Sequence, residues 1–201
     1  MNKIDITKID QLFKIHKGFA RTNDLLEAGI HTRQIKALLD SGRVSKVRPG
    51  IYRSAKMNIG SNQGFIDLKR AVPDGVICLL SALAYFELTT FNPSVISMAL
   101  PRGMWRPKVL YPPVEFYYFS RKQFDAGIQE IKIGSDKVRI YCPEKTICDC
   151  FRYRNKLGLD TVKEGLAEYL KGKDRNLEKL LEYAQICRVK PTVQTWLNAM
   201  A

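Results

Sequence analysis

The sequence predicts an α+β protein with two domains, a small N-terminal one and a larger mixed α/β one that ends in helices. The chain has 201 residues, of which 45% are hydrophobic and 26% charged, as in ordinary globular proteins with a buried core. Its hydrophobic periodicity changes along the chain, and residues 55–62 are small and polar and show none. We therefore place the domains at residues 1–56 and 63–201.

Three helices are predicted in the first domain. Apolar residues recur at spacings of three and four over residues 5–16, which is typical of an amphipathic helix. Thr22 can cap a second helix that ends at Gly29, because its hydroxyl can accept a hydrogen bond from an unpaired backbone amide. Thr32 can cap a third helix that ends near Gly42. The second and third helices follow one another after a tight turn.

A β-hairpin is predicted directly after these helices. Residues 43–48 and 51–53 alternate in polarity, and the dipeptide between them is Pro49-Gly50. Proline fixes its own backbone angle and glycine supplies a positive one, so this dipeptide favours a turn. Three helices followed by a hairpin predict a winged helix-turn-helix.

The second domain mixes both kinds of element. Strands are expected at residues 94–100, 114–119, 128–133 and 137–142. Helices are expected at residues 63–71, 76–87, 143–154, 160–171, 176–186 and 192–199, the last three separated by Gly172 and Pro191.

The charge of the chain predicts a polyanionic partner. The net charge is +13, and the N-terminal segment carries most of it per residue. Residues 1–56 hold 12 basic and 5 acidic side chains, a net of +7, whereas residues 57–201 hold 21 and 15, a net of +6. A basic patch on a helix-turn-helix indicates binding to nucleic acid.

The expected DNA contacts lie on the third helix and the hairpin. With Ile35 and Leu38 facing inward, the polar side chains of the third helix face outward, where they can read base edges in the major groove. A solvated helix face is the alternative, but like charges on a short hairpin repel one another and favour an external anion. Arg21, at the start of the second helix, could also meet a phosphate at that helix terminus, but it is equally typical of plain surface. The predicted DNA contacts are Thr22, Thr32, Arg33, Gln34, Lys36, Arg43, Lys46, Arg48 and Arg53.

Two basic clusters in the second domain are weaker candidates for DNA contact. Arg102 and Arg106 flank Trp105, a residue type that more often anchors a core or an interface than stacks on a base. Cations also follow the helix predicted at 143–154, where they could either favour the helix dipole or contact a phosphate. These cations are Arg152, Arg154 and Lys156.

No metal, cofactor or membrane segment is expected. The cysteines are odd in number, lack a repeated CxxC pattern and lie far in sequence from the two histidines, so we expect buried reduced thiols. The N-terminus is charged and does not resemble a secretory leader, and the longest apolar run is too short for a bilayer. A cytoplasmic protein is therefore predicted. The cysteines are Cys78, Cys142, Cys148, Cys150 and Cys187.

Enzymatic motifs are not evident in the sequence, and the chain is not predicted to be an enzyme. A glycine-rich phosphate loop, GxSxG, HExxH and a cysteine paired with a histidine base are all missing. Asp125 with Glu130 and Lys132 is the nearest approach to a metal-dependent nuclease. A nuclease-like second domain, or a purely regulatory protein-interaction domain that also joins protomers on adjacent half-sites, stays open as the alternative.

The chain resembles a known family along most of its length. Residues 21–53 have the cadence "LxxxGIxxxxIxxLxxxGxLxxVxxGxY" of the AbiEi antitoxins, found in bacterial abortive-infection toxin-antitoxin systems that serve in phage defence. In the second domain, LLSALAYFELT at residues 79–89, ISMALPRG and PEKTICDCFRYRNKLGLD at 143–160 resemble the antitoxin domain. Tyr85-Phe86 stands where that family usually has a histidine, so no role of that histidine carries over.

The resemblance implies a function as well as a fold. AbiEi antitoxins are transcription repressors that bind inverted repeats in the promoter of their own operon, a form of autoregulation. They counteract a nucleotidyltransferase-like toxin without requiring a stable complex with it, as type IV antitoxins do. The resemblance therefore implies promoter DNA as one partner of this chain and such a toxin as the other.

Overall fold

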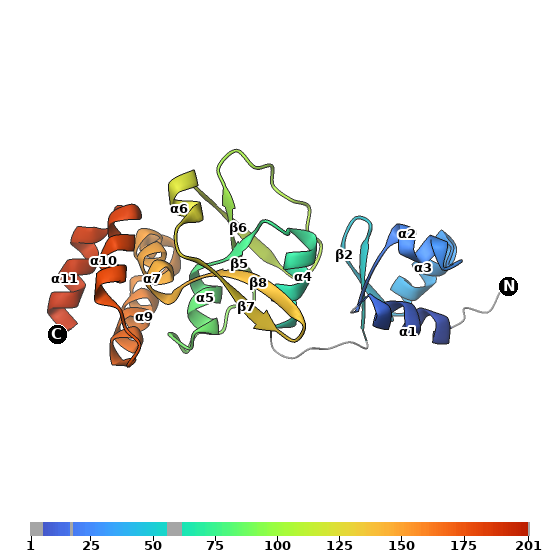
Figure 1. Cartoon of the computed structure of the whole chain (residues 1–201), viewed down its shortest axis with the longest axis horizontal. Helices are drawn as coiled ribbons and strands as arrows, with labels where there is room; N and C mark the ends of the chain where they lie inside the picture. Colours follow the sequence, from blue (N-terminus) through green and yellow to red (C-terminus); the bar gives the residue numbers. More distant parts are fainter. Residues whose placement is uncertain (1–5, 17, 56–61, 201) are drawn as a thin grey trace. The chain divides into compact units, whose positions relative to one another are not determined.

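The chain forms two compact units in the computed structural model, which describes residues 6–16, 18–55 and 62–200 (Figure 1). Unit 1 comprises Met1–Pro73 and Pro107–Pro113, and unit 2 comprises Asp74–Arg106 and Val114–Ala201. Together they confirm the predicted α+β class with an N-terminal winged helix-turn-helix and a helical C-terminus. Among the described residues, no helix has the length and apolar character needed to cross a bilayer.

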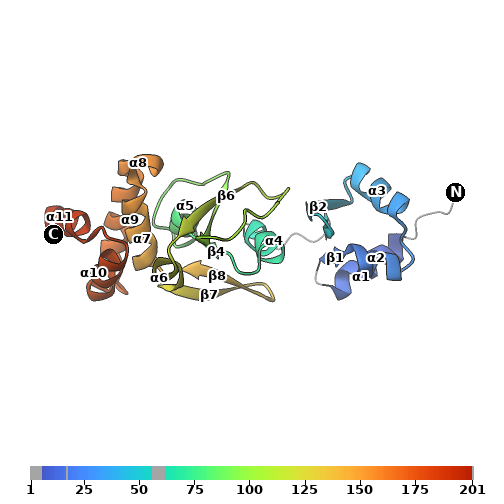
Figure 2. The same ribbon diagram turned by 90° about the horizontal axis from the view of Figure 1, so that it is seen from above.

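The described residues of unit 1 form four helices and a three-stranded antiparallel sheet. The sheet has the strand order β1-β3-β2, and its core includes Phe13, Leu25, Ile35 and Leu38, all less than 4% exposed. The view in Figure 2 shows α3 beside the hairpin. The elements are α1 (Ile6–Ile15), β1 (Phe19–Arg21), α2 (Thr22–Glu27), α3 (Thr32–Asp40), β2 (Val44–Arg48), β3 (Ile51–Ser54) and α4 (Gln63–Ala71).

The helix caps differ from the prediction. Thr22 and Thr32 are the first helical residues rather than the caps. The Arg21 amide donates to Asp24 Oδ2 at 2.7 Å, and the His31 amide donates to the Gln34 side chain at 2.9 Å. In both helices a side chain from the first turn therefore satisfies the backbone amide that precedes the helix.

The border between the two units also differs from the prediction. The expected break at residues 55–62 falls largely on residues 56–61, which lie outside the described residues. The structure groups α4 and residues 107–113 with the N-terminal module. In unit 1 the amide of Leu110 donates to the carbonyl of Val47 at 3.0 Å, and the Arg70 guanidinium lies 5.2 Å from the centre of the Phe19 ring. These contacts are long-range, so local periodicity could not predict them.

Unit 2 combines a five-stranded mixed sheet with helices. The strand order is β6-β5-β4-β8-β7, in which β5 and β6 are parallel and β7 and β8 antiparallel. The strands are β4 (Val76–Ile77), β5 (Ile96–Pro101), β6 (Val114–Phe119), β7 (Ile128–Ile133) and β8 (Asp136–Tyr141). The helices are α5 (Leu79–Tyr85), α6 (Arg121–Asp125), α7 (Pro143–Arg152), α8 (Arg154–Leu157), α9 (Leu159–Lys171), α10 (Leu177–Ile186) and α11 (Lys190–Met200).

Helix α7 lies at the centre of unit 2. Its residues from Glu144 to Phe151 are all buried, and it contacts α5, α9, α10 and α11. This helix therefore joins the sheet to the C-terminal helices, which lie beside it in Figure 1. A helix that is buried on all sides belongs to the interior of a domain.

Candidate nucleic-acid interface

Helix α3 presents a basic face to solvent. Ile35 and Leu38 are 3% and 2% exposed and hold the inner face of the helix against the core. Thr32, Arg33 and Lys36 are exposed, as the sequence predicts. Arg33 and Lys36 are three residues apart and therefore lie on the same side of the helix. Two cations and a hydroxyl are thus free to contact bases or phosphates.

Gln34 has a structural role that the sequence analysis missed. It is only half-exposed, and its side-chain oxygen accepts the hydrogen bond from the His31 amide. It follows Arg33 directly, so it points about 100° around the helix from it. Gln34 thus positions the start of α3.

The hairpin turn is tied to the start of α2. The Thr22 amide donates to the Gly50 carbonyl at 3.0 Å. Beside this bond, Arg21 and Arg48 both pair with Ile51 on β3, one from each side. Residues that face one another across strands point to the same face, so the two arginines form a row about 10 Å long between Cα atoms. Strand β1 places Arg21 beside the turn, a position that the predicted set of cations does not include.

The other hairpin cations are spread over different places. Lys46 pairs with Tyr52, on the opposite face from Arg48, and its ammonium lies 6.0 Å from the centre of the Tyr52 ring. A bulge between Lys46 and Arg48 breaks the alternation of the strand, so these two side chains lie on opposite faces of the sheet. Arg43 is exposed and precedes β2, at the end of the strand away from the turn. The predicted cations therefore do not form a single row.

Arg53 is engaged inside unit 1. Its guanidinium donates to Asp67 Oδ2 at 2.7 Å and lies 5.2 Å from the centre of the Tyr111 ring. The Asp67 side chain is 0% exposed and the Arg53 side chain 18%. Burial raises the pKa of Asp67, while hydrogen bonds from Gln63 and the charge of Arg53 lower it. We therefore correct the expectation that Arg53 binds DNA, because a buried carboxylate requires this cation.

The two basic clusters predicted in unit 2 both contact β6, Arg102 at its last residue and Lys156 near its first. The backbone amide of Arg102 donates to the Phe119 carbonyl at 2.8 Å, and Lys156 pairs with Glu115 at 2.6 Å. Arg154 donates to the Phe151 carbonyl at 2.9 Å, which is the local role at the end of a helix that the sequence allows. The Trp105 side chain is 93% exposed, so it does not anchor the core.

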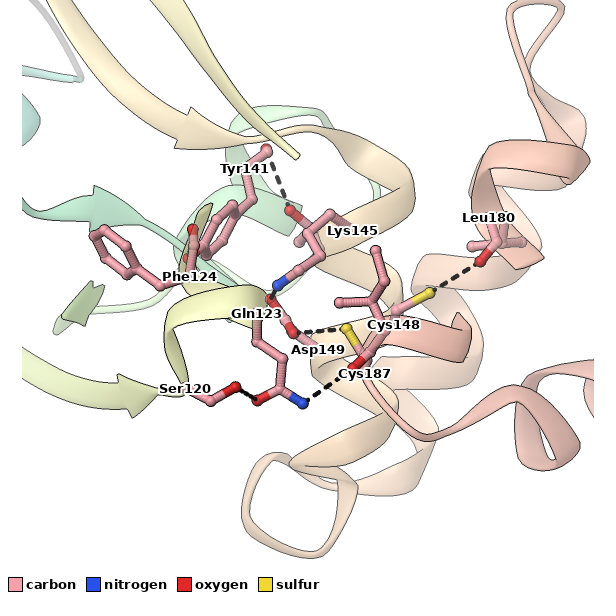
Figure 3. Close-up of polar contacts among 11 residues, drawn as sticks. Ser120, Gln123, Phe124, Tyr141, Lys145, Cys148, Asp149, Leu180 and Cys187 are labelled. Atoms are coloured by element: carbon pink, nitrogen blue, oxygen red, sulfur yellow. Dashed lines mark hydrogen bonds and ion pairs between the residues drawn. The ribbon is translucent and has the colours of Figure 1, made fainter. Parts of the chain in front are cut away.

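A buried polar network surrounds α7 (Figure 3). The Lys145 ammonium pairs with Asp149 at 2.5 Å, and both side chains are 0% exposed. The Cys187 thiol donates to the other Asp149 oxygen at 3.2 Å, and the Lys145 ammonium lies 4.2 Å from the centre of the Tyr141 ring. Burial raises the pKa of Asp149, and Lys145 opposes that rise. Because solvent does not reach these groups, their role is to join α7 to its neighbours.

The acidic residues considered for a nuclease are each paired with a cation. Asp125 bonds to Arg121 at 2.6 Å, and Glu130 lies 3.1 Å from the ammonium of Lys137. In the described part of the chain, no group of three histidine, cysteine or acidic side chains could hold a metal ion. Burial raises the pKa of Cys142 to about 11 and that of the other four cysteines further, so all five are neutral thiols at pH 7.

The fold and surface of unit 1 define a class of protein. Three helices, a three-stranded wing and an exposed basic third helix make a winged helix-turn-helix, a class in which the third helix reads DNA. Residues 8–55 match the family described as "Transcriptional regulator, AbiEi antitoxin". This match confirms the family resemblance for the N-terminal module.

A likeness of fold extends over both units. The structure is similar to the crystal structure of the RV2827C protein from Mycobacterium tuberculosis, with a TM-score of 0.57 and 15% sequence identity. The likeness covers 94% of this chain and 79% of that one, and at this identity it shows the fold alone. No curated protein matches the chain.

Proposed function

We propose that this chain is a DNA-binding antitoxin of a bacterial abortive-infection system that represses its own operon by binding inverted repeats. The exposed basic face of α3 carries the proposal, because it stands on a winged helix whose residues 8–55 match a family of transcriptional regulators. Arg33 and Lys36 contact base edges or phosphates in the major groove. Arg21 and Arg48, beside the hairpin turn, contact the phosphates flanking that groove.

The DNA contact is tested with the double variant Arg33→Ala/Lys36→Ala. Gel retardation on the promoter of its own operon should be lost, because two cations leave the groove-reading face. The matched control is Lys173→Ala/Lys190→Ala, which removes the same charge from exposed positions in unit 2 and should retain binding. Circular dichroism should show both variants folded. Full retardation by the first variant would refute the assignment of α3.

Salt dependence tests the phosphate contacts separately. For the native chain, the logarithm of the binding constant should fall linearly with the logarithm of salt concentration, by about 0.9 per phosphate neutralised. Arg48→Ala should reduce this slope by about one phosphate and weaken binding to all sequences alike. An unchanged salt slope in Arg48→Ala would show that Arg48 does not contact a DNA phosphate.

The second part of the proposal is that the chain counteracts a nucleotidyltransferase-like toxin without a stable complex. If repression and neutralisation use different surfaces, Arg33→Ala/Lys36→Ala should lose repression and still rescue growth when the toxin is expressed from a separate promoter. Loss of rescue in a folded variant would show that neutralisation depends on the DNA-reading face. This function needs no catalysis by the chain.

A further inference from the structure

Unit 2 carries a basic surface built from two segments that are distant in sequence. The first follows β5 and contains Arg102, Trp105 and Arg106; the second lies at the end of α7 and in α8 and contains Arg152 and Lys156. We call these five residues the Trp105 patch. Arg102, Trp105, Arg106 and Lys156 are exposed and Arg152 is half-exposed.

Backbone and ring contacts bring the two segments together. The amide of Arg102 is bonded to the carbonyl of Phe119 at 2.8 Å. The Phe119 ring lies 5.9 Å from that of Tyr153, which directly follows Arg152 at the end of α7. Burial raises the pKa of Tyr153 against the opposing charges of Arg152 and Arg102. Both arginines are therefore close to the same ring.

The other two cations meet at Glu115. Lys156 forms an ion pair with this carboxylate at 2.6 Å, and its ammonium lies 4.6 Å from the centre of the Tyr117 ring. Hydrogen bonds from Lys156 and Tyr117, together with the charge of Arg106, lower the pKa of Glu115. Glu115 offsets one of the four cations of the patch, so the patch keeps a net positive charge.

Trp105 is the unusual member of this surface. Its side chain is 93% exposed, although exposed indole is unfavourable in water. The loop before Trp105 turns at Gly103, whose φ is +89°. A Cβ at this position would meet no atom within 4 Å, so glycine is needed here for the backbone conformation and not for close packing. An indole face held in solvent between two arginines can stack on a flat π system.

We propose that the Trp105 patch binds single-stranded nucleic acid, with an unpaired base stacked on Trp105 and adjacent phosphates held by Arg102 and Arg106. The cations favour a polyanion, and the exposed ring selects one whose bases are accessible. A duplex keeps its bases stacked internally, so its phosphates would contact the cations of the patch and no base would stack on the indole. This activity is separate from promoter binding by α3.

The test is fluorescence anisotropy with the full chain and a labelled oligothymidylate of about 20 nucleotides, which has no pairing partner. Trp105→Ala should weaken binding roughly 5- to 100-fold, the loss expected for one stacked base. Trp105→Phe should retain most of the affinity, since phenylalanine also stacks. The matched control is Phe91→Ala, which removes another aromatic side chain, 50% exposed in the same unit, and should leave binding unchanged.

Two further measurements separate the sources of binding. Arg33→Ala/Lys36→Ala should bind the oligothymidylate like the native chain, so failure of promoter binding does not decide this proposal. On a fully paired duplex of unrelated sequence, Trp105→Ala should have no effect. Equal affinity of Trp105→Ala and the native chain for the single strand would overturn the proposal. An equal loss of affinity of Trp105→Ala for the single strand and for the duplex would also overturn the proposal. Such a result would show that the patch binds the phosphate backbone and not an unpaired base.

Discussion

Arg53 and Asp67 show how one residue can be misjudged when its partner is distant in sequence. From the sequence, Arg53 is one of several hairpin cations, and its charge favours a role in DNA binding. In the structure Arg53, on strand β3, neutralises a carboxylate that is 0% exposed and lies on helix α4. Removing it should therefore affect the stability of unit 1 before it affects any DNA contact.

Arg53→Ala should lower the free energy of unfolding by about 3 kcal/mol, because it leaves a buried carboxylate without its cation. The loss should be smaller at acid pH. Burial raises the pKa of Asp67 in the folded chain. The protonated Asp67 carboxyl therefore contributes fully to folding stability below the pKa of the unfolded chain, and this contribution is lost as pH rises through the folded pKa. Urea unfolding of the native chain and of Arg53→Ala, measured from neutral to acid pH, checks both effects.

The control for this prediction is a second substitution on the Arg53→Ala background. Asp67→Asn removes the buried charge, keeps the shape of the side chain and should restore part of the lost stability. If the single variant were as stable as the native chain at pH 7, the ion pair would contribute nothing to the fold.

The sequence predicted the exposed face of α3 better than the wing. Arg33 and Lys36 follow from helical pitch once Ile35 and Leu38 are placed inward, and the structure puts all four as expected. The bond from the His31 amide to Gln34 does not follow from the sequence, because a polar residue in the first helical turn can serve either the helix cap or solvent. The faces of Lys46 and Arg48 depend on a bulge, which alternation of polarity alone does not reveal.

At the scale of elements, regular patterns predicted most of the secondary structure. The strands expected at residues 114–119 and 128–133 have the observed bounds of β6 and β7. The apolar run at 76–87 predicts one helix, whereas the structure has β4 followed by α5 there. A fully buried strand and a buried helix cannot be told apart by periodicity.

Several short or irregular elements were missed for related reasons. Strand β1 and helix α6 have three and five residues, too few for a period to be visible. Helix α11 begins at Lys190, before the Pro191 that was expected to separate two elements. Proline is tolerated in the first turn of a helix, where no intrahelical partner awaits its missing N–H.

The buried pair in α7 makes a prediction about that helix. Lys145→Met should destabilise unit 2 by about 3 to 5 kcal/mol, because Asp149 would remain in the interior without its cation. The double variant Lys145→Met/Asp149→Leu should be more stable than Lys145→Met alone, since neither charge is then buried. Thermal unfolding of the full chain, followed by circular dichroism, measures both. A double variant less stable than Lys145→Met would contradict this prediction, because it would show that the Asp149 carboxylate stabilises the fold even without its cation.

At the scale of the molecule, unit 1 is larger than the module that the sequence predicted. A fragment of residues 1–56 lacks α4 and therefore both Asp67 and Arg70, which lies over the Phe19 ring. We expect this fragment to unfold at a temperature several degrees below that of residues 1–73, since about 1 kcal/mol shifts the midpoint by about 4 to 8 °C in a domain of this size. Equal midpoints would show that the first 56 residues are sufficient.

The division of unit 1 between two stretches of chain restricts how this winged helix could be recombined with other proteins. A chimera joined at residue 56 would inherit Arg53 without the helix that holds Asp67, and β2 without the Leu110 amide that bonds to its Val47 carbonyl. A recipient protein would have to supply a carboxylate and a donor of its own at those places. Gene fusions that exchange this module cleanly should therefore carry the segment through Pro73, and they should recreate the return of residues 107–113.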